Sequence, residues 1–81
     1  MMRLTHTLTR PDRPKEIVRL YVDGTPRNGD VRCIIRYRDR DTGEPVEHRY
    51  PPGLISAEAE NENRASGNEK LGWNVTRESD R

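Results

Sequence analysis

Several β-like segments of this sequence carry arginine at positions that alternate with apolar residues. Successive side chains of a strand point to opposite faces of a sheet, so residues two apart share a face. One face of a sheet would therefore carry Arg19, Tyr21, Arg32, Ile34, Arg36, Arg38 and Arg49. Guanidinium groups bind carboxylates and phosphates by paired hydrogen bonds, and an interleaved tyrosine can stack on a base. These residues are the predicted binding surface.

Three interpretations of this arginine-rich face remain open at the level of sequence. The arginines can be solvated, pair with Glu47 or Asp23 on neighbouring strands and protect the sheet from aggregation. They can bind an acidic protein partner, or they can form a platform for RNA or single-stranded DNA. The paired aromatic residues of ribonucleoprotein-type sheets are missing, because the chain contains no Phe.

The charge is unevenly distributed along the chain. Residues 1–40 hold ten Lys and Arg against five Asp and Glu, whereas residues 41–81 hold five against nine. Such a dipole can steer a partner although the formal net charge is only +1. Glu58, Glu60 and Glu62 add a diffuse negative ridge on a predicted helix, either solvated or opposed to a basic groove of a partner.

Residues suited to catalysis or metal binding are few. His6, His48 and Cys33 show no metal-ligand spacing and fall on predicted inward faces, which indicates core residues. A Cys33–His48 contact is conceivable, but a cysteine in mid-strand is poorly placed as a nucleophile. Residues 24–29 are too short and wrongly placed for a phosphate loop, which should open a helix. We therefore expect no enzyme, no metal and no cofactor.

Size and composition limit the class of protein. The chain has 81 residues, 30% apolar and 36% charged, which predicts one small domain with a thin core. A single cysteine excludes a disulfide framework, and no apolar run is long enough to span a membrane. No secretory signal is recognisable, so we expect the cytoplasm. So thin a core also leaves a homodimer open, for example through an unpaired sheet edge.

Hydrophobic alternation predicts an α+β fold, a small antiparallel sheet of four to five strands with one short helix on one face. Strands are expected at residues 2–9, 16–23, 30–38, 45–50 and 71–76, with a turn at 11–14 and a tight hairpin with left-handed Gly43. Ser56 should cap a helix over residues 57–65 that Gly67 or Asn68 ends, and residues 77–81 should form a frayed tail.

The same alternation predicts which side chains face inward. This inward set comprises Leu4, His6, Leu8, Val18, Leu20, Val22, Val31, Cys33, Ile35, Tyr37, Val46, His48, Tyr50, Ile55, Leu71, Trp73 and Val75. The arginine-rich face is the opposite side of the same sheet.

A small, highly charged, β-rich chain with one cysteine resembles the accessory proteins of phages and mobile elements, and it is similar in style to the small anti-CRISPR inhibitors. The resemblance is architectural and covers the whole chain: the segments 16–23 and 31–50, then Ser56-Ala57-Glu58-Ala59-Glu60, then Trp73. It transfers no functional residues, because those inhibitors share no common fold. It implies non-catalytic binding to a CRISPR effector complex that blocks recognition or recruitment.

Overall fold

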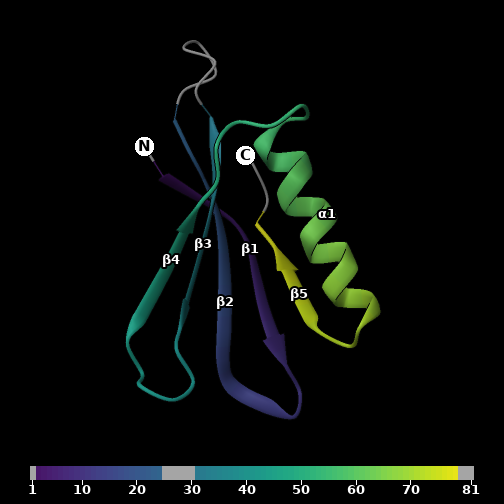
Figure 1. The fold of residues 1–81 in the computed structure, drawn as a ribbon. Helices are drawn as coiled ribbons and strands as arrows, with labels where there is room; N and C mark the ends of the chain where they lie inside the picture. Colours follow the sequence, from purple (N-terminus) through teal and green to yellow (C-terminus); the bar gives the residue numbers. More distant parts are fainter. Residues whose placement is uncertain (1, 25–30, 79–81) are drawn as a thin grey trace.

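A computed structural model describes residues 2–24 and 31–78. It contains five strands and one helix in the order β1 (Met2–Arg10), β2 (Arg13–Asp23), β3 (Arg32–Arg38), β4 (Pro45–Arg49), α1 (Ala57–Lys70) and β5 (Asn74–Arg77). The strands form one antiparallel sheet in the order β4-β3-β2-β1-β5 (Figure 1). The predicted α+β class is confirmed.

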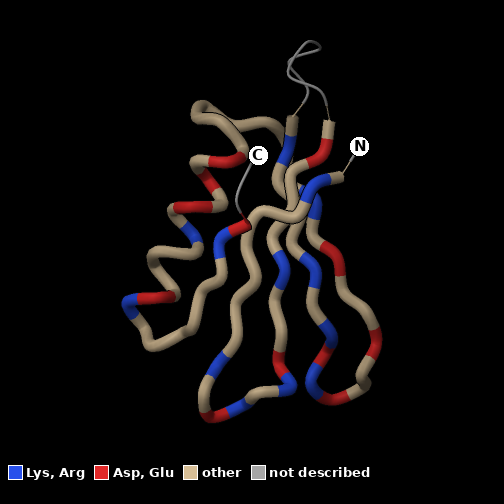
Figure 2. The backbone as a smooth tube through the Cα atoms, turned by 180° about the vertical axis from the view of Figure 1, so that it is seen from behind, with Lys and Arg blue, Asp and Glu red and all other residues tan. Residues whose placement is uncertain are grey.

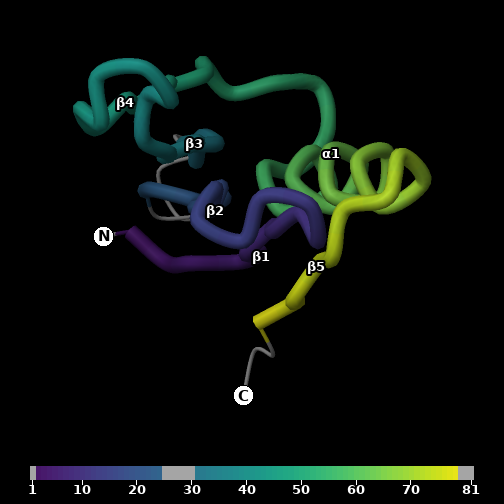
Figure 3. Tube along the Cα trace, turned by 90° about the horizontal axis from the view of Figure 1, so that it is seen from below, coloured from purple at the N-terminus to yellow at the C-terminus, as the bar shows by residue number. Residues whose placement is uncertain are grey.

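Helix α1 divides the sheet into two unlike faces. It lies on one side and contacts β1, β2, β3 and β5, but not β4. Seen from below, α1 runs beside β1, β2 and β5 while β4 lies at the far end of the sheet (Figure 3). We call the side that carries α1 the helix-covered face and the other side the open face.

A β-bulge in β1 changes which side chains face the helix. Leu4 pairs with Tyr21 and His6 pairs with Leu20, so Thr5 is the extra residue between them. The shift reverses the alternation, because one inserted residue turns the following side chains over. His6 and Leu8 therefore face α1 as predicted, but Leu4 lies on the open face and its predicted inward position is wrong.

The polar side chain of the bulge residue explains why the helix docks there. Thr5 is buried, and its hydroxyl donates to the Leu20 carbonyl oxygen at 3.1 Å and accepts from Asn61 Nδ2 at 3.0 Å. Asn61, fully buried on α1, also donates to the Tyr21 carbonyl oxygen at 3.1 Å. Buried polar groups are stable only when paired, so these bonds fix the position of α1 on the sheet.

Pro14 lies inside β2, whereas the prediction placed it in the turn before the strand. The strand begins at Arg13 rather than at Glu16, and the turn is confined to Pro11 and Asp12. The β1–β2 register jumps from Thr9↔Ile17 to Arg10↔Arg13, which leaves residues 14–16 without partners on β1. Proline is tolerated in such an irregularity because no ladder hydrogen bond needs its missing N–H.

Helix α1 is longer than predicted. Ser56 is the N-cap as expected, since its Oγ accepts from the Ala59 N–H at 3.1 Å. Gly67 and Asn68 do not end the helix, which continues to Lys70. The end comes at Gly72, whose φ of +101° allows the Gly72 and Trp73 N–H groups to bond back to Glu69 and Asn68 in a Schellman motif. The glycine after the helix, not the one inside it, terminates the element.

The core lies between α1 and the sheet in two small clusters. Leu8, Leu20 and Ala65 form one, with Val18, Ile35, Trp73 and Val75 against it; Val22, Cys33 and Ala57 form the other, with Val31 against it. Alanines provide the helix side of both clusters because they allow the helix backbone to approach closely.

Several residues predicted to face inward lie at the surface. Leu71 is 81% exposed, Ile55 48% and Tyr50 36%, and His48 is also exposed. Leu71 belongs to the helix end rather than to a strand, because β5 starts only at Asn74. His48 lies on β4, which α1 does not reach.

Arg77 and Glu78 do not belong to a frayed tail, contrary to the prediction. Arg77 is the last residue of β5, and the Glu78 N–H donates to the Thr5 carbonyl oxygen at 2.8 Å. Residues 79–81 and most of the predicted 24–29 loop lie outside the described residues, as does Asp30, the expected start of the third strand.

Candidate binding surface

Strand pairing places the predicted arginine-rich set on the open face. Arg19 and Tyr21 of β2 pair with Arg36 and Ile34 of β3, and Ile34 pairs in turn with Arg49 of β4. Directly paired residues point to the same side of a sheet, so these side chains share one face. Arg32 lies two residues from Ile34 on β3, and Arg38 lies two residues from Arg36, so both share this face as well. Figure 2 shows the sheet from behind, with basic and acidic positions interleaved over these strands.

Ile34 is not an exposed member of that face. It is 0% exposed, although α1 lies on the other side of the sheet. Its direct cross-strand neighbours are Tyr21 and Arg49, whose long side chains can cover it. The open face therefore has a buried apolar point beneath its charges, and the expectation that Ile34 contacts a partner directly is wrong.

The part of the open face around Glu47 is an ion-pair network. Glu47 Oε1 accepts from Arg36 Nε at 2.6 Å, and Glu47 Oε2 accepts from Arg49 Nε at 2.6 Å. Arg49 also reaches Asp23 at 3.5 Å. The Arg49 and Arg36 guanidinium groups hold the pKa of the Glu47 carboxyl below its usual range. These arginines are largely neutralised by the chain itself.

Tyr21 is also less available than the sequence suggests. The Arg36 guanidinium carbon lies 5.3 Å from the centre of the Tyr21 ring, a cation–π contact. The ring is half-buried. A base could stack on that side of Tyr21 only after Arg36 moved.

Three cations of the open face beyond this network have no carboxylate partner. Across residues 2–24 and 31–78, the side chains of Lys15 and Arg19 form no hydrogen bond or ion pair, and the Arg38 side chain bonds only the Gly43 carbonyl oxygen at 2.9 Å. These three side chains line one groove. On the open face, the free positive charge is therefore concentrated at one end, away from Glu47.

The groove lies where the sheet divides into two hairpins. The pairing between β2 and β3 ends at Arg19↔Arg36. Beyond that point β2 remains paired only with β1, as far as Arg13, and β3 remains paired only with β4, as far as Arg38. The β1–β2 and β3–β4 hairpins separate below that point (Figure 1). We call this gap the fork. It encloses about 840 Å³ and is lined from both faces of the sheet.

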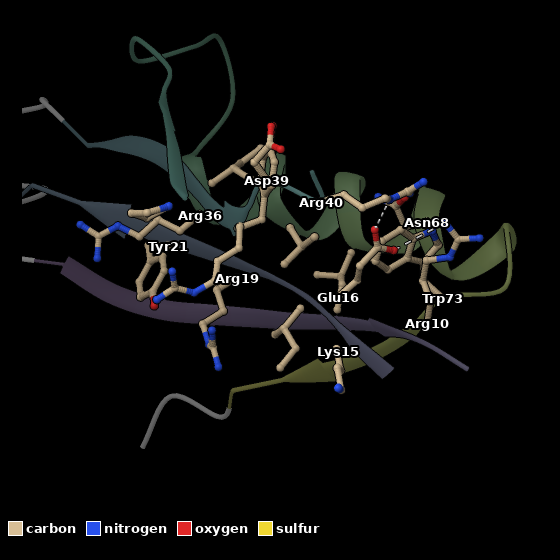
Figure 4. Close-up of a pocket in the computed structure, with 17 residues that line it drawn as sticks. Arg10, Lys15, Glu16, Arg19, Tyr21, Arg36, Asp39, Arg40, Asn68 and Trp73 are labelled. Atoms are coloured by element: carbon tan, nitrogen blue, oxygen red, sulfur yellow. Dashed lines mark hydrogen bonds and ion pairs between the residues drawn. The ribbon is translucent and has the colours of Figure 1, made fainter. Parts of the chain in front are cut away.

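Ion pairs and an aromatic side chain surround the fork on the helix-covered side. Arg40 of the β3–β4 turn donates to Glu16 of β2 at 2.9 Å, and so links the two hairpins. Arg10 lies over Trp73, with 5.3 Å between the guanidinium carbon and the ring centre. Figure 4 shows Arg40, Glu16, Arg10 and Trp73 together at one end of the groove.

Sequence reasoning missed these fork residues for a physical reason. Arg10, Lys15 and Arg40 lie in or beside turns, where strict alternation gives no prediction of facing. Trp73 packs against the core as predicted, but its second contact, with the fork, was not predictable because the divergence of β2 from β3 leaves no trace in a period-two pattern. The one available signal was Pro14, which indicates a weak pairing position inside a strand.

The acidic ridge of α1 is paired rather than free. Glu58 reaches Arg3 at 3.0 Å, and Glu60 lies 3.7 Å from Arg64. Glu62 accepts a bidentate pair from Arg77 at 2.9 and 2.8 Å, together with bonds from Ser66 and His6. These partners, Arg77 foremost, hold the pKa of Glu62 far below its ordinary value. The ridge acts as the tie between α1, β1 and β5.

The residues considered for catalysis or metal binding each contact a different group. His6 contacts Glu62, His48 contacts Tyr37 at 3.1 Å, and Cys33 Sγ donates to the Ala57 carbonyl oxygen at 3.2 Å. Burial raises the pKa of the Cys33 thiol. The described part of the chain holds no group of three or more His, Cys, Asp or Glu arranged to bind a metal ion.

No protein-family model, curated protein or solved structure matches this chain. Among the described residues, α1 is the one helix, and it is too short and too polar to cross a membrane.

Proposed function

We propose that this protein is a non-enzymatic, protein-binding inhibitor that covers an acidic surface of its partner, as small anti-CRISPR proteins cover a surface of a CRISPR effector complex. The observation that carries the proposal is the division of the open face. Lys15, Arg19 and Arg38 are free cations beside an ion-pair network centred on Glu47. The cytoplasm of a host cell is the compartment that this proposal requires.

A protein partner fits this face better than nucleic acid does. Glu47 and Asp23 lie among the arginines and would repel a phosphate backbone, whereas a protein can present both signs of charge in a complementary pattern. Tyr21, the one aromatic ring of the predicted set, is already occupied by Arg36. Proteins bind single-stranded nucleic acid through base stacking and a continuous positively charged surface, and the open face offers neither in full.

Binding without catalysis is supported by the chemistry of the only thiol. Cys33 is 1% exposed and its raised pKa favours the unreactive thiol form. Its Sγ donates to Ala57 O at 3.2 Å and to Glu60 Oε2 at 3.4 Å, so the thiol is bonded within the fold rather than presented to a substrate.

A binding assay with purified CRISPR effector complexes tests the proposal. Immobilised effector complexes should capture the protein, and Arg19→Glu should weaken capture about tenfold or more, which corresponds to about 1.4 kcal/mol. Lys70→Glu makes the same charge change on an exposed residue at the end of α1 and should leave capture unchanged. Equal weakening by both variants would show that only overall charge matters.

Nucleic acid is tested in parallel by fluorescence anisotropy with labelled single- and double-stranded oligonucleotides over a range of salt concentrations. We expect weak binding. Tight binding with a steep salt dependence, lost in Arg19→Glu, would replace the protein partner with a nucleic-acid ligand. Absence of binding to both effector complexes and nucleic acid would overturn the proposal.

A further inference from the structure

We propose that the fork between the two hairpins binds an extended segment of a partner protein, in which apolar and acidic residues alternate, by adding it as a strand between β2 and β3. This inference deepens the proposed function, because it names the part of the partner that this end of the molecule recognises. It rests on the backbone of the fork, on its two chemically different sides and on its charge.

The first support is a pair of strand edges with free backbone groups. The Cys33 carbonyl oxygen accepts from the Tyr50 N–H, and the Asp39 N–H donates to the Glu44 carbonyl oxygen, so odd-numbered residues of β3 bond toward β4. Backbone groups alternate along a strand, and Arg38 must therefore point its N–H and C=O toward β2. Because the β2–β3 pairing stops at Arg19↔Arg36, that edge of Arg38 has no partner strand.

The same alternation identifies the matching residue of β2. Arg36 bonds toward β2 and pairs with Arg19, so odd-numbered residues of β2 face β3, and Ile17 follows Arg19 in that series. Ile17 and Arg38 would be the next hydrogen-bonded pair if the register continued. They instead face each other across the fork. Unpaired edges of this kind are templates for another extended chain.

The second support is the difference between the two sides of the fork. Toward the helix-covered face, the groove is lined by the half-buried apolar side chains of Val18, Ile35 and Trp73. Toward the open face it is lined by Lys15, Arg19 and Arg38, none of which has a carboxylate partner. Side chains of an inserted strand alternate between these two environments. The segment that fits therefore alternates apolar and acidic residues.

The third support is the overall charge of the groove. Its cationic lining residues are Arg10, Lys15, Arg19, Arg36, Arg38 and Arg40, and its anionic lining residues are Glu16 and Asp39. Glu16 forms an ion pair with Arg40 and also lies 3.7 Å from Arg13 and 4.0 Å from Arg10. Glu16 is therefore a negative charge inside the groove, and its removal would make the groove more attractive to an acidic guest.

A synthetic peptide is the direct probe. An acetylated, fluorescein-labelled octapeptide of alternating Val and Glu should bind with a dissociation constant on the order of 10 μM, as measured by anisotropy. The Val–Lys peptide of the same length should not bind, and N-methylation of alternate peptide bonds should abolish binding because it removes strand donors. Glu16→Gln should tighten binding several-fold, Arg38→Glu should weaken it at least tenfold, and Lys70→Glu should have no effect.

Amide hydrogen exchange distinguishes strand addition from simple charge attraction. The Ile17 and Arg38 amides should exchange quickly in the free protein and become protected with the peptide. The Val18 and Tyr37 amides, directed at β1 and β4, are internal controls that should change little. Peptide binding without protection at Ile17 and Arg38, or no binding at 1 mM peptide (a concentration about 100 times the expected constant), would overturn the inference. Neither result would affect capture of the protein by effector complexes, so the inference about the fork can fail while the proposed function stands.

Discussion

The two faces of the sheet use the same residue types for different purposes. On the helix-covered face, Arg77 and Glu62 form a bidentate pair that joins β5 to α1, backed by His6 and Ser66. On the open face, Arg36 and Arg49 share Glu47 without any element above them. The first pair connects a strand to a helix, and His6 adds a strand 56 residues from Glu62 to the same carboxylate. The second pair connects neighbouring strands that are already joined by backbone bonds.

This difference shows that an ion pair matters through what it connects. Exposed pairs between adjacent strands contribute little to stability, because water screens them and the strands are held otherwise. A pair that links a helix to two strands also orders those elements, especially where the apolar contact is supplied mainly by alanines such as Ala57 and Ala65. The open face is therefore free to be used for binding.

The largest effect is expected from Ile34, the one buried apolar residue that the described part of the chain places on the open face. Ile34→Ala should lower the free energy of unfolding by about 3 kcal/mol, because it removes buried methyl groups and leaves a cavity. Urea denaturation measures the loss. Ile17→Ala, a half-buried isoleucine on the same side, is the matched control and should lose clearly less. Equal losses would mean that the open face has no core of its own.

A smaller effect should come from acid. The pKa of Glu62 is far lower in the folded chain than in the unfolded chain, because Arg77, Ser66 and His6 bond its charged form. The unfolded state then binds more protons between the two pKa values. The Glu62 contribution is complete above about pH 4.5, near the ordinary glutamate pKa, and declines as pH falls toward the folded-state value. Solvent screening keeps it below about 1 kcal/mol.

Urea midpoints between about pH 2 and 7, spanning the ordinary glutamate pKa, provide the measurement. Glu62→Gln should flatten the acid side of the stability profile, whereas Glu58→Gln, on an exposed glutamate of the same helix, should not. An unchanged acid slope in Glu62→Gln would show that the tie between α1 and β5 does not depend on the charge of Glu62.

The elements were predictable where one local rule decided them. The alternation of Val18, Leu20 and Val22 predicts a strand, and Ser56 predicts the start of the helix. Gly43 adopts the expected left-handed conformation, with a φ of +74°. The facing of Leu4 was not predictable, because a single bulge residue, stabilised by the distant Asn61, reverses the alternation. The fork was equally hidden, since whether β3 stays paired with β2 depends on tertiary geometry rather than on either strand.

The smallest effect, and the one that most directly contrasts the two faces, is expected for Arg36→Gln. The side chain is exposed, its partner Glu47 retains Arg49, and β3 stays paired with β2 and β4 through the backbone. The urea midpoint should therefore not change measurably. Arg77→Gln makes the same substitution in the pair that links β5 to α1, and should lower the midpoint. If Arg36→Gln lowered it as much as Arg77→Gln, the ion pairs of the open face would be as structural as those under α1, and the contrast between the two faces would have to be abandoned.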